Sequence, residues 1–120
     1  MRFTLKGTRT ASEKTVLLNG ERLTPDKSQA VINHSPDGFE WGYGGSGPAQ
    51  LALAVLLELH DKETACKNYQ KFKHEFIANI GRADFDLRID YHINWKQEII
   101  LDDVAGVIVH TAKHLVNNPC

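Results

Sequence analysis

The stretch GGSGPAQLALAVLLELH, residues 44–60, decides the fold of this chain. It opens on a glycine-rich turn and continues into a segment whose only polar residues are Gln50, Glu58 and His60. Proline suits the first position of a helix, because its missing N–H would have no partner there. Pro48 therefore predicts a helix over 48–60, with Ser46 or Gly47 as its N-cap. A helix that is apolar nearly all round is buried on most sides, so we expect it to form the core.

A second helix is predicted over 62–80, with Gly81 as its C-cap. Its apolar residues recur at the spacing of one helical face. They are Ala65, Tyr69, Phe72, Phe76, Ile77 and Ile80.

The part of the chain before the glycine-rich turn predicts strands. Residues 2–9 alternate weakly between apolar and polar side chains. Asn19-Gly20 separates the β-forming runs 15–18 and 21–23, and this pair is a strong hairpin signal because both turn residues need a positive φ.

Two further strands are predicted between this hairpin and the turn. Ala30-Val31-Ile32 lies between two segments rich in turn residues and predicts a brief strand. Residues 39–43 place Phe39, Trp41 and Tyr43 at period two, which predicts a strand with one aromatic face and with Glu40 pointing the other way.

The last forty residues alternate strictly at first. Residues 85–91 predict a half-exposed strand whose period Ile93 and Trp95 extend. Asp102 or Asp103 would then cap a final helix that reaches Leu115. Together these elements predict an α+β fold. We expect one globular domain over residues 1–120, with a hairpin and short strands packed on the buried helix and on the second, amphipathic helix.

Composition bounds the partners. The chain has 120 residues, 14 basic and 15 acidic, with a net charge of -1, so no overall field attracts nucleic acid, and we do not expect it as a partner. Residues 1–6 lack the apolar region of a signal peptide, and the longest apolar run, 51–57, is too short to cross a membrane. Cys120 is terminal, so we expect no disulfide with Cys66 and a cytoplasmic location without membrane contact.

The glycine-rich turn has the layout of an anion site. Gly44, Gly45, Ser46 and Gly47 follow a predicted strand and precede a helix, whose first N–H groups and dipole attract negative charge. Because no lysine of a P-loop follows and GxGxxG is absent, neither nucleotide motif is present. The alternative is a tight corner that lets the helix pack closely.

Four more residues near the turn are candidates for ligand binding. Trp41 and Tyr43 could stack a flat ligand, or could pack in the core. Asn33 and His34 precede a Pro-Asp-Gly turn, and His34 could donate to an anion or be satisfied within its loop.

Other motifs favour structural readings. His110 and His114 share a helix face with no third ligand beyond His92, so we expect no metal. Lys67, Lys71, Lys73 and His74 are expected to form a solvated face. These patterns predict no catalytic residue and no cofactor, and they favour a protein that is not an enzyme.

The segment GFEWGYGGSGPAQLALA, residues 38–54, resembles an uncharacterised family, a domain of unknown function associated with bacteria, archaea, phages and mobile elements. The flanking Asn33-His34-Ser35-Pro36 and residues 69–73 agree with it. The resemblance covers residues 7–80, and 82–120 depart from its pattern. It implies a compact domain carried by a phage or an integrated element, and it implies no activity.

Two functions from different classes follow as expectations. The first is non-catalytic binding, or sequestration, of a small phosphorylated ligand or nucleotide at the glycine-rich turn. The second is a protein-binding inhibitor of a host defence protein. An enzyme of unknown reaction and a homo-oligomer stay open.

Overall fold

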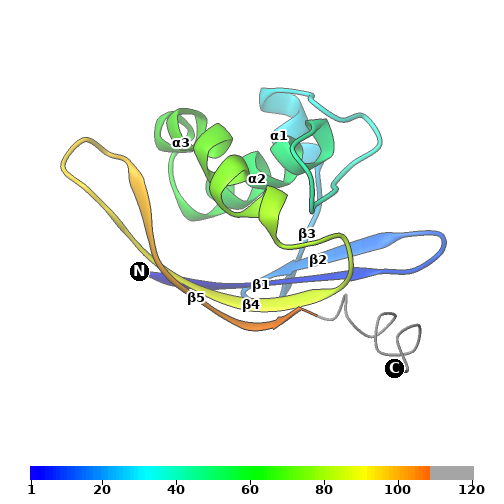
Figure 1. The fold of residues 1–120 in the computed structure, drawn as a ribbon. Coiled ribbons are helices and arrows are strands. Elements are labelled where there is room, and N and C mark those ends of the chain that lie inside the picture. The colour runs from blue at the N-terminus through cyan, green and yellow to red at the C-terminus, as the bar shows by residue number, and fades with distance from the viewer. Residues whose placement is uncertain (109–120) are drawn as a thin grey trace.

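The computed structural model describes residues 1–108 and shows an α+β fold of two layers. A five-stranded antiparallel sheet in the order β3-β2-β1-β4-β5 carries all the helices on one face (Figure 1). In chain order the elements are β1 (Arg2–Arg9), β2 (Lys14–Leu18), β3 (Glu21–Leu23), α1 (Asp26–Val31), α2 (Ser46–Leu59), α3 (Lys62–Glu75), the 3-10 helix η1 (Ile77–Asn79), β4 (Phe85–Ile93) and β5 (Ile99–Ile108).

The N-terminal strand lies at the centre of the sheet. Alternate residues of β1 and β4 face the helices, as period two requires, and Leu5 pairs with Leu18 on one side and Leu87 on the other. The predicted hairpin is confirmed, because Asn19 and Gly20 take φ values of 51° and 83° between β2 and β3.

The predicted core helix is confirmed. Every residue of α2 from Gly47 to Leu57 is buried, between the sheet and α3. The helix begins at Ser46 with Gly45 as its cap, so Pro48 occupies the third helical position rather than the first.

The predicted strand at residues 30–32 is wrong, because residues 26–31 form α1. An apolar run of three residues is too short to distinguish a strand from a helix. Ser28 donates to the carbonyl of Pro25 at 2.8 Å, and the buried Ser28 docks α1 on α2. Asp26 in the first turn was the available helix signal.

The predicted strand at residues 39–43 is also wrong. Phe39 and Trp41 are buried, but Tyr43 is 38% exposed, so the aromatic face is divided. Gly42 has a φ of 90° and donates its N–H to Ile77 in η1 rather than to a strand. A β-carbon on Gly42 would overlap the carbonyl of Gly81, so the two loop segments need this close approach.

The second helix is shorter than predicted. α3 ends at Glu75, Phe76 departs from helical geometry, and η1 continues to Asn79. Gly81, with a φ of 78°, therefore follows η1 and does not cap α3.

The C-terminal region is a hairpin, which corrects the predicted final helix. β4 confirms the strand at residues 85–91, but Trp95 lies in the following turn. Residues 99–108 form β5, and residues 109–115 of the predicted helix lie outside the described residues. Val104, Val107 and Ile108 fit a helical spacing, yet β-branched residues favour a strand when a neighbour such as β4 can pair with it.

Candidate functional site

The polar residues before the glycine-rich turn are tied to the core by Gln50. This side chain is fully buried on α2. Its oxygen accepts the N–H groups of His34 and Ser35 at 2.7 and 3.0 Å, and its nitrogen donates to Ser28 Oγ and to the carbonyl of Ile32 at 2.9 and 3.0 Å. All four hydrogen-bonding positions of the amide are thus used within the protein.

The side chain of His34 is also hydrogen-bonded within the protein. Its Nε2 lies 2.8 Å from the hydroxyl of Tyr69 on α3, and the histidine is half-buried. Asn33 beside it is exposed. The predicted Asn33-His34 cluster therefore joins α1, α2 and α3, and its histidine serves packing rather than an open site. We call Gln50, Ser28, His34, Ser35 and Tyr69 the Gln50 cluster.

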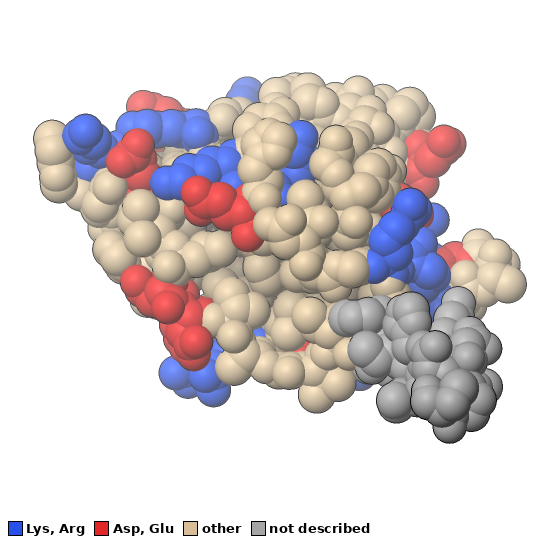
Figure 2. All heavy atoms as spheres, in the orientation of Figure 1, with Lys and Arg blue, Asp and Glu red and all other residues tan. Residues whose placement is uncertain are grey.

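A second cluster surrounds the carboxylate of Glu40. Arg9 binds both of its oxygens, at 2.7 and 3.0 Å, Lys14 lies at 3.2 Å, and Arg82 at 3.9 Å. The side-chain hydrogen bond from Arg9 is the main cause that lowers the pKa of Glu40 to about 2. We call these four residues the Glu40 network. Figure 2 shows lysine and arginine atoms gathered at the end of the sheet where β1 ends and β2 begins.

Two arginines of this network stack on the candidate aromatic rings. The guanidinium of Arg9 lies 4.6 Å from the ring centre of Trp41, and that of Arg82 lies 4.7 Å from the ring centre of Tyr43. Trp41 is fully buried, donates to the carbonyl of Ala83 and packs edge-on against Phe85. Trp41 thus belongs to the core, whereas Tyr43 and the 61% exposed side chain of Arg82 face solvent.

The glycines of the turn differ in what surrounds them. A β-carbon on Gly47 would lie 2.5 Å from Cβ of Glu40, and one on Gly45 would overlap the Tyr43 ring. Around Gly44 nothing lies within 4 Å of such a carbon. No side chain caps the start of α2 at Gly45. Gly47 serves close packing, while Gly44 borders open space between Tyr43 and the helix start.

Sequence reasoning missed the cations of this region. Arg9 ends β1 and Lys14 begins β2 across a short loop, but Arg82, before β4, and Glu40 are far from them along the chain. Because each stands alone in the sequence, only the antiparallel pairing of β1 with β2 and β4 indicates that they share one end of the sheet.

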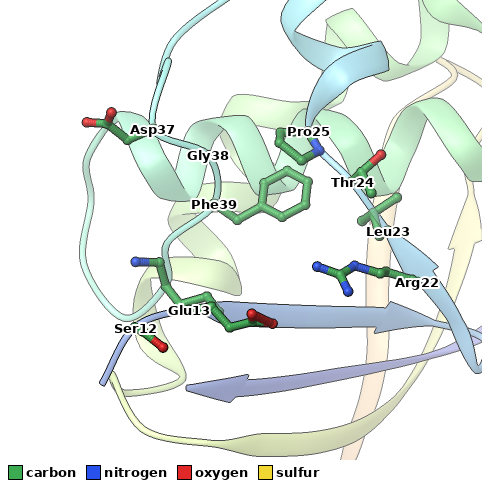
Figure 3. Close-up of a pocket in the computed structure, with 10 residues that line it drawn as sticks. Ser12, Glu13, Arg22, Leu23, Thr24, Pro25, Asp37, Gly38 and Phe39 are labelled. Atoms are coloured by element: carbon green, nitrogen blue, oxygen red, sulfur yellow. The ribbon is translucent and has the colours of Figure 1, made fainter. Parts of the chain in front are cut away.

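A hollow of about 270 Å³ lies beside this region (Figure 3). Apolar side chains such as Phe39, Pro25 and Leu23 alternate around it with charged ones such as Glu13 and Arg22. Its lining consists of Ser12, Glu13, Lys14, Arg22, Leu23, Thr24, Pro25, Asp37, Gly38 and Phe39. No predicted ligand residue is among them, so the hollow is distinct from the glycine-rich turn.

The remaining sequence candidates are placed as follows. His92 is exposed and pairs with Asp102 at 2.9 Å, and His110 and His114 lie outside the described residues. Within residues 1–108, no group of three or more potential ligands could hold a metal. Lys67, Lys71 and His74 are exposed as predicted, but Lys73 is buried, so the expected solvated face is interrupted.

These observations define a small α+β domain with a sheet covered on one face and an open, basic corner at the start of its buried helix. The chain belongs to DUF6166, a family of unknown function, whose sequence profile matches residues 5–98. The match includes β4, beyond the residue 80 at which the recognised resemblance ended. No curated protein and no solved structure matches this chain. Among residues 1–108, no helix is long and apolar enough to cross a membrane.

Proposed function

We propose that this protein is a non-catalytic binder of a small phosphorylated ligand, of the size of a nucleotide, at Tyr43, Gly44 and the start of α2. The observation that carries the proposal is the exposed Arg82 side chain, whose guanidinium lies over the Tyr43 ring at 4.7 Å from its centre, next to the open space at Gly44. A stacked guanidinium keeps its N–H edges available, and it pairs with phosphate oxygens through two parallel hydrogen bonds.

The helix start supports the same ligand class. α2 has no side-chain cap, and the positive end of its dipole favours an anion there. Gly44 leaves the backbone open to close approach. Tyr43 adds an exposed aromatic ring for a flat group.

The residues of the proposed site, Tyr43, Gly44 and Arg82, favour binding without catalysis. Arginine stays protonated at all relevant pH values, and the histidine nearest in sequence is bonded to Tyr69. In a phage or mobile element, such a protein would sequester a nucleotide of the host cell.

The test is a calorimetric titration with inorganic phosphate and with mono-, di- and cyclic nucleotides. We expect a Kd below about 1 mM for at least one nucleotide. Arg82→Gln should weaken binding by about tenfold or more, as loss of a charged hydrogen bond does. Arg22→Gln, which makes the same charge change in an exposed residue of β3, is the control and should bind normally.

Two results would overturn the proposal. If every nucleotide fails to bind below about 1 mM, the ligand class is wrong. If Arg22→Gln loses binding and Arg82→Gln retains it, the anion occupies the hollow instead of the turn.

A second candidate is a protein-binding module that inhibits a host defence protein. The exposed Val104 and Val107 on β5, which is an edge strand within the described sheet, favour it, because such edges accept a strand from a partner. A negative nucleotide screen would make this the leading function.

A further inference from the structure

The turn between β4 and β5, residues 94–98, projects beyond the helices at one end of the molecule, and we call it the tip (Figure 1). The side-chain oxygen of Asn94 accepts the N–H groups of Lys96 and Glu98 at 2.9 and 3.0 Å. Its side-chain nitrogen donates to the Glu98 carboxylate at 2.9 Å. One asparagine therefore holds the turn in one conformation.

Helix α3 fixes the tip to the body of the protein. Asn68, which is 3% exposed, donates to the carbonyl of Gln97 and accepts the N–H of Ile99, both at 2.9 Å. Lys67 donates to the carbonyl of Lys96. Gln97 has a φ of 63°, a conformation that costs free energy for a residue with a side chain. A buried amide and a residue with a positive φ thus both maintain the shape of the tip.

The tip presents a large aromatic side chain to solvent. Trp95 is 84% exposed, and the ammonium of Lys96 lies over its ring, 5.2 Å from the ring centre. The other face of the indole is open. Ordering a turn costs conformational entropy, and an exposed tryptophan returns almost no burial free energy to the fold. A tryptophan that is already held in place loses little entropy when a flat group stacks on it, so the tip favours such a ligand.

Lysines surround the tip. The hydrogen bond from Asn94 is the main cause that lowers the pKa of the Glu98 carboxyl below its ordinary value. The positive charges of three lysines lower it further, which places these side chains close to Glu98. They are Lys71, Lys96 and Lys67. Figure 2 shows lysine atoms along this end of the molecule, with carboxylates among them.

The positive charge at the tip is local. Glu75 shares Lys71, at 3.9 Å, and Asp61 and Glu63 lie at the start of α3, where Asp61 accepts the N–H of Thr64. The whole chain has a net charge of -1, so no long-range field adds to the attraction, as its composition indicates. An anionic ligand of the tip is therefore held by a few short contacts.

Single-stranded nucleic acid matches both features of the tip. Each nucleotide brings a base with a flat π-face and a phosphate, and stacking on an aromatic side chain tolerates any base. A protruding side chain does not enclose a free nucleotide as a pocket does, but a strand can continue past it on both sides. A lipid surface offers phosphate without a flat group for the indole face.

We propose that the tip binds single-stranded DNA or RNA, with one base stacked on the open face of Trp95 and phosphates beside Lys96, Lys67 and Lys71. The contact does not use the corner of residues 43–44 and Arg82, so it is independent of the function proposed above. One stacked base and a few phosphates supply the affinity. Binding is therefore weak, tolerant of sequence and sensitive to salt.

The test titrates the full chain into dye-labelled oligothymidylate and oligouridylate of about 12 nucleotides, a usual site size, and follows the fluorescence anisotropy of the dye. We expect a Kd of about 100 µM or lower at low salt. Trp95→Ala should weaken binding by about tenfold, as loss of one stacked base does. Trp95→Phe keeps an aromatic ring and should retain most of the affinity.

The salt dependence tests the lysines. For three phosphate contacts on a single strand, the slope of log affinity against log salt concentration should be about −2. The double variant Lys71→Gln with Lys96→Gln should reduce the slope to about −0.7. Lys6→Gln with Lys27→Gln, which removes two exposed lysines elsewhere, is the matched control and should keep the slope of the wild type.

Intrinsic fluorescence gives an independent measurement. The chain has two tryptophans, and Trp41 is fully buried. Quenching of the emission by an unlabelled strand therefore reports on Trp95. Arg82→Gln, which alters the corner, should bind the strand like the wild type.

Three results would overturn the inference. They are the absence of binding to both strands up to about 1 mM, binding that survives Trp95→Ala unchanged, and binding lost in Arg82→Gln but kept in Trp95→Ala, which would place the strand at the corner. Adsorption to vesicles of phosphatidylcholine and phosphatidylserine, without binding of either strand, would assign the tip to a lipid surface instead.

Discussion

The Gln50 cluster and the corner formed by Tyr43, Gly44 and Arg82 lie on the two sides of the start of α2, and they differ in how their polar groups are used. In the Gln50 cluster, a buried amide has four partners within the protein. At the corner, the Arg82 side chain is 61% exposed and reaches Glu40 only at 3.9 Å. Polar groups whose hydrogen bonds are all made within the protein hold its elements together. Exposed groups that still have free hydrogen-bond donors or acceptors remain available to a ligand.

The Glu40 network lies between these extremes. Its carboxylate forms two hydrogen bonds with Arg9, whereas its ion pair with Arg82 is long, at 3.9 Å. The same cluster stabilises the fold through Arg9, and Arg82 is the residue to which we assign the proposed anion. Three pairs of variants test the Gln50 cluster, the Glu40 network and the glycine-rich turn, and we give the largest expected effect first.

Gln50→Leu should destabilise the protein by about 3 kcal/mol or more, because each buried group left without a partner costs about 1–3 kcal/mol. The N–H of Ser35 and Ser28 Oγ would each lose a bond. The measurement is urea unfolding at pH 7. Gln70→Leu, on the exposed face of α3, is the matched control and should change stability by less than about 0.5 kcal/mol. Similar losses in both variants would show that the Gln50 cluster has no structural role.

Glu40→Gln should cost about 2 kcal/mol at pH 7, which is less than the full pKa shift would give, because solvent screens a partly exposed ion pair. The pKa of Glu40 is lowered from 4.5 to about 2 in the folded state, first of all by the hydrogen bond from Arg9. A lowered pKa of this kind contributes stability above pH 4.5. That contribution declines as the pH falls from 4.5 towards 2, because the folded state resists protonation.

Urea unfolding between pH 7 and pH 2 measures this contribution. The difference between wild type and Glu40→Gln should be constant down to about pH 4.5 and should shrink below it. Glu21→Gln, an exposed residue of β3, is the control and should follow the wild type. A difference that does not depend on pH would contradict the ionic role of Glu40.

Gly47→Ala should destabilise the protein by about 1–3 kcal/mol, because the added methyl group would overlap Glu40 and force the helix start away from it. Gly44→Ala should change stability by less than about 0.5 kcal/mol, since nothing lies near its β-carbon position. Thermal unfolding of both variants without ligand tests the comparison. Equal losses would show that the turn acts as one structural unit and that Gly44 does not border open space.

The sequence predicted elements whose signals are local. Asn19-Gly20 specified a turn with two positive φ values, and the apolar run of 51–57 specified a buried helix. It failed where a segment is too short or fits two periods. Residues 30–32 became helical once Ser28 docked on Gln50, and residues 102–108 became a strand once β4 was available to pair with them.

The candidate site divides along the same line. The sequence predicts the glycine-rich turn, Tyr43 beside it and the start of the helix, because neighbouring residues determine a turn and a helix cap. Contacts between distant segments decide the rest. They bury Trp41 in the core, bond His34 to Tyr69 and place Arg82 over the Tyr43 ring.

The sequence by itself determined the α+β class, the hairpin, the buried helix and the glycine-rich turn at its start, because hydrophobic period and backbone preference act over a few residues. Only the tertiary structure decided which polar groups are satisfied and which are exposed. Glu40 is bound by cations from β1, from β2 and from the segment before β4, and Trp95 is left in solvent by a turn that Asn68 holds from α3. Those outcomes depend on which segments the sheet brings together, and no single segment carries that information.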